Sequence, residues 1–266
     1  YATTGTKKKF WSIWREEELP EAELSAIRNA KLTLEQVGSL FTERPGYALA
    51  DYKRLHAAPV AVTEQDRLII GLLRPSRLLD FTRRFMFFDK KLGKIVARYQ
   101  QVQGAKAIIQ QVSKKKPDGS REGGVIWHTT GSGKSNLMVF LTKALLVEPD
   151  LAGARVIVVT DRVDLEKQLA GTFLTGGAFG SDVATKKDGE KAKVQSGKEL
   201  AVRIGSGSER IIFTLLQKFN SATKLPECHN SSDQLIVLVD EGLRSQGGEN
   251  HERMRKALPN AAFIAF

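Results

Sequence analysis

The sequence predicts an α/β fold that contains a parallel sheet, preceded by a mostly helical segment. The first observation is a set of short apolar runs that are continuous rather than alternating, which is typical of strands covered on both faces. The second is that stretches with helical spacing separate these runs, and such alternation is typical of the α/β class. Five runs are expected as strands: residues 124–127, 155–159, 211–213, 235–239 and 261–266.

Two stretches between these strands are expected as helices. Residues 134–146 form the first, and the second carries an apolar side chain at every fourth position, at Leu165, Leu169 and Phe173. Residues 175–209 are rich in Gly, Lys and Ser, and we expect an exposed loop there with one short element at 200–204.

The region before the first strand has mainly helical spacing. One helix is expected to carry four apolar side chains three or four positions apart, Leu78, Phe81, Phe85 and Phe88. A second is expected over residues 102–112, and Thr33 is expected to cap a shorter one. Lysine, proline and glycine then cluster at residues 114–120, which indicates a solvated loop at a boundary. We therefore expect a mostly helical region at 1–116 and an α/β region at 117–266.

Composition excludes several classes of protein. The chain has 266 residues, 41 basic and 30 acidic side chains and a net charge of +11, and its 41% hydrophobic content is enough to bury a core. No run approaches the roughly 18 apolar residues of a membrane span. The single cysteine, Cys228, excludes a disulfide framework and a thiolate zinc site, so we expect a cytoplasmic location. Because the chain starts without methionine and stops within an apolar run, we expect a piece of a longer protein.

The strongest motif lies between the first expected strand and the helix that follows it. Its glycines let consecutive N–H groups point at phosphate oxygens, and the helix start adds further N–H groups and a positive dipole end. Lys134 would neutralise the β and γ phosphates, and the Ser135 hydroxyl would hold Mg²⁺. His128 stands where the strict pattern has glycine. The nucleotide-binding candidates are Thr130, Gly131, Ser132, Gly133, Lys134 and Ser135.

A second motif, Asp240-Glu241, follows the strand expected at 235–239. A carboxylate at the carboxyl end of a buried strand lies at the edge where open α/β folds bind ligands. Asp240 could hold Mg²⁺ and Glu241 could orient and deprotonate an attacking water. On its own the pair would more commonly be an acidic turn, but downstream of the phosphate loop it predicts nucleotide hydrolysis.

Several motifs in order resemble those of one family. Residues 124–129 with the Gly-Ser-Gly-Lys-Ser that follows look like ATPase motif I of the restriction (R) subunit of type I restriction-modification enzymes. The later motifs of that family are similar to Thr160-Asp161-Arg162, Phe213-Thr214, Gln217-Lys218-Phe219 and Asp240-Glu241 with Arg244-Ser245-Gln246. Upstream, Leu78-Leu79-Asp80 and Arg98-Tyr99-Gln100-Gln101 resemble the segments that enter its motor.

The resemblance implies a superfamily 2 DNA translocase that uses ATP and Mg²⁺. Residues 1–116 would connect a nuclease to the motor, and residues 117–266 would be the first RecA-like P-loop NTPase lobe, truncated before the second lobe. The partners implied are double-stranded DNA and the modification and specificity subunits, with no membrane.

Site residues follow from the same resemblance. Lys134 and Glu241 would be catalytic, and Ser135 and Asp240 would hold Mg²⁺ with ATP. The adenine-reading glutamine would be Gln100 or Gln101, of which we favour Gln101. The candidates for DNA contact are Arg162, Thr214 and Lys218, which could instead cap or pack near strand ends. The lysine clusters, such as residues 114–116, fit DNA tracking but also suit solvated loops.

The chain departs from the family pattern after Glu241. Gly242 and Leu243 replace alanine and histidine, and leucine cannot form the hydrogen bonds of histidine. We expect the chain to bind ATP, hydrolyse it poorly and leave DNA uncut, because the second lobe and the nuclease residues are absent. One alternative is a degenerate or truncated nucleotide-binding or assembly module without turnover. Another is a different superfamily 2 helicase, against which the Trp-His-Thr and Arg-Ser-Gln runs argue.

Overall fold

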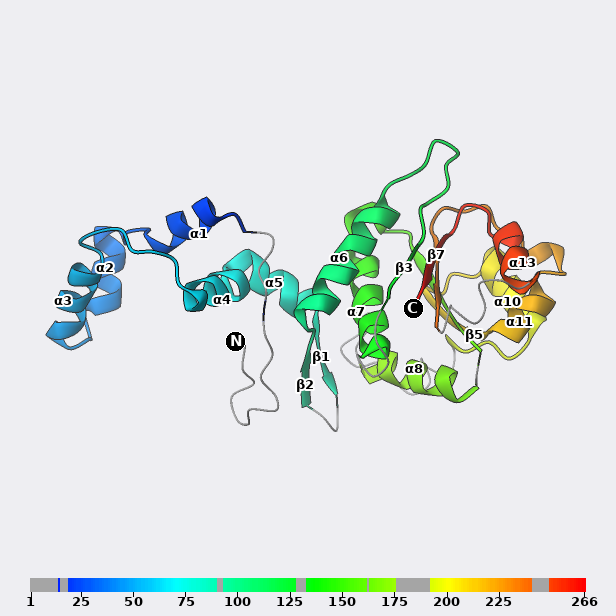
Figure 1. Cartoon of the computed structure of the whole chain (residues 1–266). Helices are drawn as coiled ribbons and strands as arrows, with labels where there is room; N and C mark the ends of the chain where they lie inside the picture. The colour runs from blue at the N-terminus through cyan, green and yellow to red at the C-terminus, as the bar shows by residue number, and fades with distance from the viewer. Residues whose placement is uncertain are drawn as a thin grey trace. The chain divides into compact units, whose positions relative to one another are not determined.

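The computed structural model describes residues 14, 19–89, 93–127, 133–161, 163–175, 192–240 and 249–266 (Figure 1). The chain divides into two compact units, Tyr1–Asp80 and Phe81–Phe266. The helix expected at 102–112 is present as α6 (Tyr99–Ser113) and belongs to the second unit. The division expected at residue 116, between a connecting region and a motor lobe, was made by function, and it stays a prediction.

The first unit is helical, as the apolar spacing predicts. Thr33 caps the second helix: its hydroxyl accepts a hydrogen bond from the Gln36 amide at 3.2 Å, and the Gln36 side chain accepts one from the Thr33 amide at 2.9 Å. An ion pair of 2.9 Å joins Arg28 to Asp66 within this unit. The helices are α1 (Glu21–Arg28), α2 (Leu34–Phe41), α3 (Gly46–Leu55) and α4 (Glu64–Leu73), and α5 (Pro75–Arg84) spans the division.

The helix expected to include Phe88 ends earlier than predicted. α5 stops at Arg84, and β1 (Met86–Asp89) follows, paired antiparallel with β2 (Gly93–Val96). Phe85 and Phe87 lie on either side of Met86 and are buried against Phe140, with ring centroids 6.5 and 5.2 Å away. Phe88 points to the other side of the hairpin and is 64% exposed. The prediction was wrong because a spacing of three and four residues does not distinguish a helix from a helix that runs into a strand.

The second unit is built on a five-stranded, fully parallel sheet in the order β3-β7-β6-β4-β5. All five strands expected from the apolar runs are present, and the α/β fold class is confirmed. β5 also has a parallel bridge from Phe213 to Lys193 on its outer side. The strands are β3 (Gly124–Val125), β4 (Arg155–Thr160), β5 (Ile211–Leu215), β6 (Leu235–Val239) and β7 (Ala262–Ala265).

Helices cover both faces of this sheet, which explains why the strands are continuously apolar (Figure 1). On one face Phe173 of α8 packs edge-on against Phe213, with ring centroids 5.1 Å apart. On the other face the core cluster combines Ile157 with Leu200, Phe219 and Met254. The first face carries α7 (Lys134–Val147) and α8 (Val163–Thr175), and the second carries α10 (Gly197–Ser206), α11 (Leu216–Ala222) and α13 (Glu249–Ala257).

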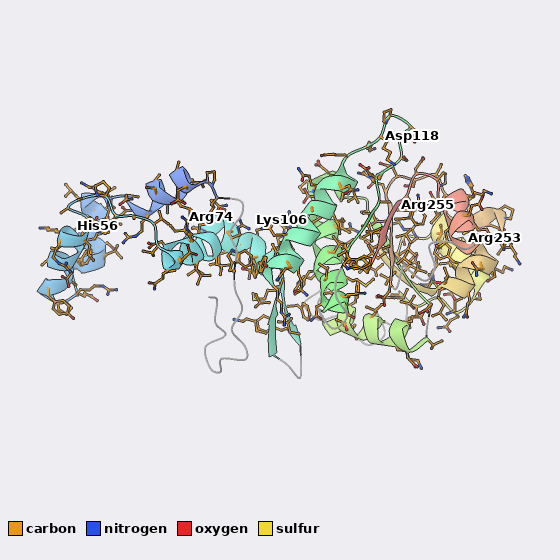
Figure 2. All side chains as sticks on the ribbon, in the orientation of Figure 1. His56, Arg74, Lys106, Asp118, Arg253 and Arg255 are labelled. Atoms are coloured by element: carbon orange, nitrogen blue, oxygen red, sulfur yellow. The ribbon has the colours of Figure 1, made fainter. Side chains whose placement is uncertain are left out.

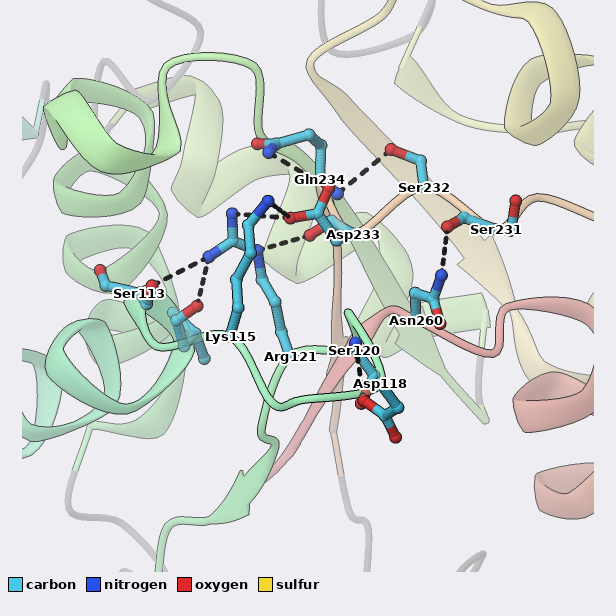
Figure 3. Close-up of polar contacts among 11 residues, drawn as sticks. Ser113, Lys115, Asp118, Ser120, Arg121, Ser231, Ser232, Asp233, Gln234 and Asn260 are labelled. Carbon is cyan, nitrogen blue, oxygen red and sulfur yellow. Dashed lines mark hydrogen bonds and ion pairs between the residues drawn. The ribbon is translucent and has the colours of Figure 1, made fainter.

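Because the strands are parallel, the sheet has an amino edge, where strands begin, and a carboxyl edge, where they end. Arginines close the amino edge by donating to helix C-terminal carbonyls. Arg155 donates to Ile204 O at 3.1 Å, and Arg210 donates to Ala152 O at 3.1 Å. Arg121, only 1% exposed at its side chain, donates to Val112 O at 2.7 Å and pairs with Asp233 at 3.1 Å (Figure 3). These bonds satisfy carbonyls that the helices themselves leave without partners.

Among the described residues, no helix is long and apolar enough to cross a membrane.

Candidate nucleotide-binding site

Gly133 forms the N-cap of α7 with a backbone conformation that only glycine adopts without strain. Its φ is +88° and its ψ is 38°, in the left-handed region that costs other residues about 1–2 kcal/mol. A Cβ at this position would also lie 3.0 Å from Gln101 Nε2. Glycine is therefore required here both by the turn and by the close approach of a side chain.

α7 begins at once after this turn. Lys134 and Ser135 are its first two residues, both half-buried, and Leu137 N donates to Gly133 O at 3.0 Å to close the first turn. The first N–H groups of a helix have no partner within it and carry the positive end of its dipole. Phe140 and Leu141, fully buried further along α7, fix this helix start in place. The geometry therefore suits a bound phosphate.

Gln101 joins the start of α6 to the start of α7. Its side chain is buried, with Oε1 accepting from Arg98 N at 2.9 Å and Nε2 donating to Gly133 O at 3.2 Å. Gln100, the other candidate, is exposed. The structure thus brings Gln101 and not Gln100 to the glycine turn, while the contact of Gln101 with adenine stays a prediction.

Asp240 lies on the same edge of the sheet as Lys134. Asp240 follows β6 directly. Its amide donates to Val159 O of the neighbouring strand β4 at 3.0 Å, and this bond fixes the backbone of Asp240 at the end of the β4–β6 pairing. One strand, β7, lies between β6 and β3, and neighbouring strands are about 4.8 Å apart. Asp240 therefore follows a strand two places from β3 in the sheet, at the edge where α7 begins.

Two of the three candidates for DNA contact, Thr214 and Lys218, are among the described residues. Thr214 is fully buried in β5 and its hydroxyl donates to Leu215 O at 3.3 Å, so its side chain cannot contact DNA in this arrangement. Thr214 lies within β5, a strand whose five residues are all buried, and this position accounts for the burial of its side chain. Lys218 is partly buried, donates to Val194 O and lies 3.9 Å from the Glu166 carboxylate.

The pairing of Lys218 with Glu166 is a feature that sequence reasoning missed. Glu166 lies on α8 and is only 5% exposed. Lys218 lies on α11, which follows α10 and β5 in the chain. No local spacing connects the two residues, so only the tertiary structure reveals the pair. The burial of Glu166, which calls for a cationic partner, is itself seen only in the structure, so the sequence carried no signal for this pair.

Several candidates lie outside the described residues. They are Thr130, Gly131 and Ser132 of the phosphate loop, with His128 before them; Arg162; and Glu241 with Gly242 and Leu243. Their roles stay predictions.

Residues 100–266 match the family model described as SWI2/SNF2 ATPase, which covers more than half of the chain. The chain belongs to the SWI2/SNF2 ATPase family. The match begins at α6, which carries Gln101, and runs through the whole parallel sheet. The helix start at Lys134 and the carboxylate at Asp240 are therefore both within the family's ATPase region.

Curated relatives narrow the comparison. The type I restriction enzyme HindI endonuclease subunit of Haemophilus influenzae is 32% identical over 87% of this chain and 23% of its own length. In Methanocaldococcus jannaschii the MjaIXP protein, named for the same type of subunit, is 33% identical over 77% of this chain and 19% of its own length. The predicted resemblance to these subunits is confirmed, and the chain spans about a fifth of their length.

Among solved structures, the UvsW helicase from bacteriophage T4 is similar with a TM-score of 0.44 and 13% identity, over 88% of this chain and 73% of that chain.

Proposed function

We propose that this chain is the first motor lobe of the endonuclease subunit of a type I restriction enzyme. In this role it binds MgATP and duplex DNA and contributes to ATP-driven DNA translocation before cleavage. The observation that carries the proposal is the start of α7 at the carboxyl edge, where Gly133 is the left-handed N-cap and Lys134 is the first helical residue. Asp240 follows β6, which is two places from β3 in the sheet. The endonuclease names of the relatives support the restriction context.

Each residue of the site has a definite task in this proposal. Lys134 binds the β and γ phosphates with the backbone N–H groups of the loop, which includes Thr130, Gly131 and Ser132. Ser135 and Asp240 hold Mg²⁺, which supplies neutralisation of phosphate charge. Glu241 orients the attacking water and accepts its proton. Gln101 contacts adenine from its fixed position against Gly133.

DNA contact is assigned to Arg162 and Lys218. The ammonium group of Lys218 is already held by Val194 O and Glu166, so a phosphate would have to compete with these two oxygens. Arg162 is therefore the stronger of the two candidates. The modification and specificity subunits are the proposed protein partners, and residues 1–116 are the proposed connection to a nuclease, because the relatives are subunits of restriction enzymes.

A second candidate function is a nucleotide-binding module without turnover. The observation that favours it is Gly242-Leu243 in the place of Ala-His, which removes a hydrogen-bonding side chain next to the catalytic carboxylates. Release of phosphate from ATP, measured with and without duplex DNA in the full-length protein, separates the two. DNA-stimulated release supports the motor, and ATP binding with no release at any DNA concentration supports the module.

Calorimetric titration of MgATP tests the site itself. We expect micromolar binding that Lys134→Ala weakens about tenfold to a hundredfold, because each charge-assisted hydrogen bond to a phosphate contributes about 1.5–3 kcal/mol. Lys198→Ala is the matched control, since Lys198 is an exposed lysine in the first turn of another helix, α10. Equal affinities for the wild type and Lys134→Ala would show that this helix start is not the nucleotide site.

A further inference from the structure

A cavity of about 350 Å³ lies on the second unit, away from the carboxyl edge. One wall is the segment that follows α11 and leads into β6, and the other is the last part of α13, which leads into β7. Both walls therefore lie at the amino edge, where strands begin. The residues that matter for its chemistry are Lys224 and His229 on the first wall, Arg253 and Lys256 on the second, and the apolar Leu225 and Ala257.

The lining of this cavity is strongly basic. It presents two lysines, one arginine and one histidine, and no aspartate or glutamate is among the described residues that line it. Lys256 has a neighbouring acid, Glu252, at 2.8 Å, but both side chains are more than 60% exposed. A solvated ion pair of this kind contributes little and leaves the lysine available to a better anionic partner.

The charge exceeds what α13 requires for its own stability. Cations in the last turn of a helix offset the negative end of its dipole, and Arg255 and Lys256 fill that role. The guanidinium of Arg255 lies 5.0 Å from the Phe263 ring. Arg253, on the same helix, is among the residues that line the cavity, and Figure 2 labels both arginines. Lys224 belongs to a different segment, so the dipole of α13 does not account for its position.

The two walls are fastened to each other. Asn230 N donates to Ala257 O at 2.9 Å, and Asn230 Nδ2 donates to Ile204 O at 2.7 Å. Behind the cavity, Cys228 and Met254 are fully buried in the core cluster. The basic groups are therefore presented by backbone that is already ordered, which lowers the entropic cost of binding a ligand between them.

We propose that this cavity binds a phosphate group, supplied either by a nucleic-acid backbone or by free phosphate. Arg253 offers the planar fork of donors that matches two phosphate oxygens, and Lys224 and Lys256 add point charges from both sides. Leu225 and Ala257 are the apolar residues that line the cavity between these charges. The site is separate from the nucleotide site at Lys134 and does not depend on the proposed function.

Binding of inorganic phosphate is the direct test, made in the Lys134→Ala background so that the phosphate loop does not contribute. The imidazole proton signals of His229 are followed by NMR during the titration. We expect saturable shifts, and a dissociation constant about tenfold higher in Lys224→Gln/Arg253→Gln. Lys198→Gln, which removes one exposed lysine charge elsewhere, should leave binding unchanged. Thermal unfolding of each variant checks that the fold is kept.

Two results of this titration would overturn the proposal. One is the absence of saturable His229 shifts when phosphate is added to the protein whose cavity residues are unchanged. The other is an equal loss of affinity in Lys198→Gln, which would indicate attraction by net charge alone. Because Lys134 is already replaced, neither result bears on MgATP binding at the phosphate loop.

A second arm separates the two sources of phosphate. A fluorescent 20-base-pair duplex is titrated by anisotropy at several salt concentrations, again in the Lys134→Ala background. If the ligand is a nucleic-acid backbone, the cavity double variant should reduce the slope of log affinity against log salt by about one for each phosphate that it no longer neutralises. Unchanged duplex binding with weakened inorganic phosphate binding supports free phosphate as the ligand. Saturable shifts with a poly-glutamate peptide but none with phosphate would overturn the proposal in favour of an acidic protein partner.

Discussion

The two edges of the sheet differ in which backbone groups of the helices they carry. At the amino edge, Arg121, Arg155 and Arg210 donate to backbone carbonyls, and these bonds tie helix ends to strand starts. At the carboxyl edge, Gly133 adopts a left-handed turn and Lys134 opens a helix. The three arginines of the first edge bind other parts of the protein, whereas the helix start of the second edge has N–H groups without partners in its own helix.

Helix polarity explains the difference. In a parallel α/β unit the helices run against the strands, so their carbonyl ends gather at the amino edge and their N–H ends at the carboxyl edge. Carbonyl ends attract cations, which a guanidinium supplies within the chain, whereas N–H ends attract anions. We therefore expect substitutions of Arg121, Arg155 and Arg210 to lower stability and substitutions at the helix start of the carboxyl edge to lower nucleotide affinity.

The largest effect is expected at Arg121. Arg121→Ala removes a buried guanidinium that contacts Val112 O and Asp233, and we expect the free energy of unfolding to fall by about 3 kcal/mol. Urea unfolding of the wild type and the variant measures this. Under native conditions the folded variant should bind MgATP with wild-type affinity. Lys134→Ala is the counterpart at the other edge, with stability changed by less than about 0.5 kcal/mol. An unchanged stability of Arg121→Ala would break the comparison.

The next effect is expected at Gly133. Gly133→Ala places a methyl group in left-handed backbone and 3.0 Å from Gln101 Nε2, so it should cost about 1–2 kcal/mol or displace the turn. Displacement would weaken MgATP binding, measured by calorimetry, by about tenfold. Gly104→Ala is the control within α6, where a Cβ meets nothing within 4 Å and helix propensity should add about 0.5–1 kcal/mol. Equal effects of the two substitutions would contradict the requirement for glycine at 133.

The strands and the helix at the phosphate loop were predictable because their signals are local. Val156, Val158 and their neighbours form an unbroken β-branched run, and Gly133-Lys134 carries its own turn and helix start. The order of the strands was not predictable, since β7 inserts between β3 and β6 through pairing of residues far apart in the chain. Such pairing has no local signature.

The environments of single side chains were not predictable for the same reason. Phe88 was assigned to a helix because its spacing fits one, but packing of Phe87 against Phe140 decides the conformation. Thr214 was a candidate for DNA contact or for packing near a strand end, and the structure shows it fully buried in a strand covered on both faces. Lys218 was recognised as a polar site residue, and only the tertiary structure shows that Glu166 is its partner.

A smaller effect is expected at the pair of glutamines that the sequence left open. Gln101→Ala removes the bond to Gly133 O and should lower the free energy of unfolding by about 1 kcal/mol and the MgATP affinity severalfold. Gln100→Ala, at an exposed position one residue earlier, is the matched control and should change neither quantity. A loss of affinity confined to Gln100→Ala would assign adenine recognition to the other residue.

The smallest effect is a pH dependence of the amino edge that comes from Asp233. Burial acts to raise the pKa of this carboxyl group, but the hydrogen bond from Lys115 and the charges of Arg121 and Lys115 lower it below its ordinary value. A carboxylate with a depressed folded-state pKa stabilises the protein above its unfolded-state pKa, and this contribution is lost as the pH falls through the folded-state pKa. Urea unfolding at pH 7, 4 and 3 should therefore show the wild type losing its advantage over Asp233→Asn below about pH 4. A constant difference between the two proteins from pH 7 to pH 3 would mean that Lys115 and Arg121 hold the amino edge together without the charge of Asp233.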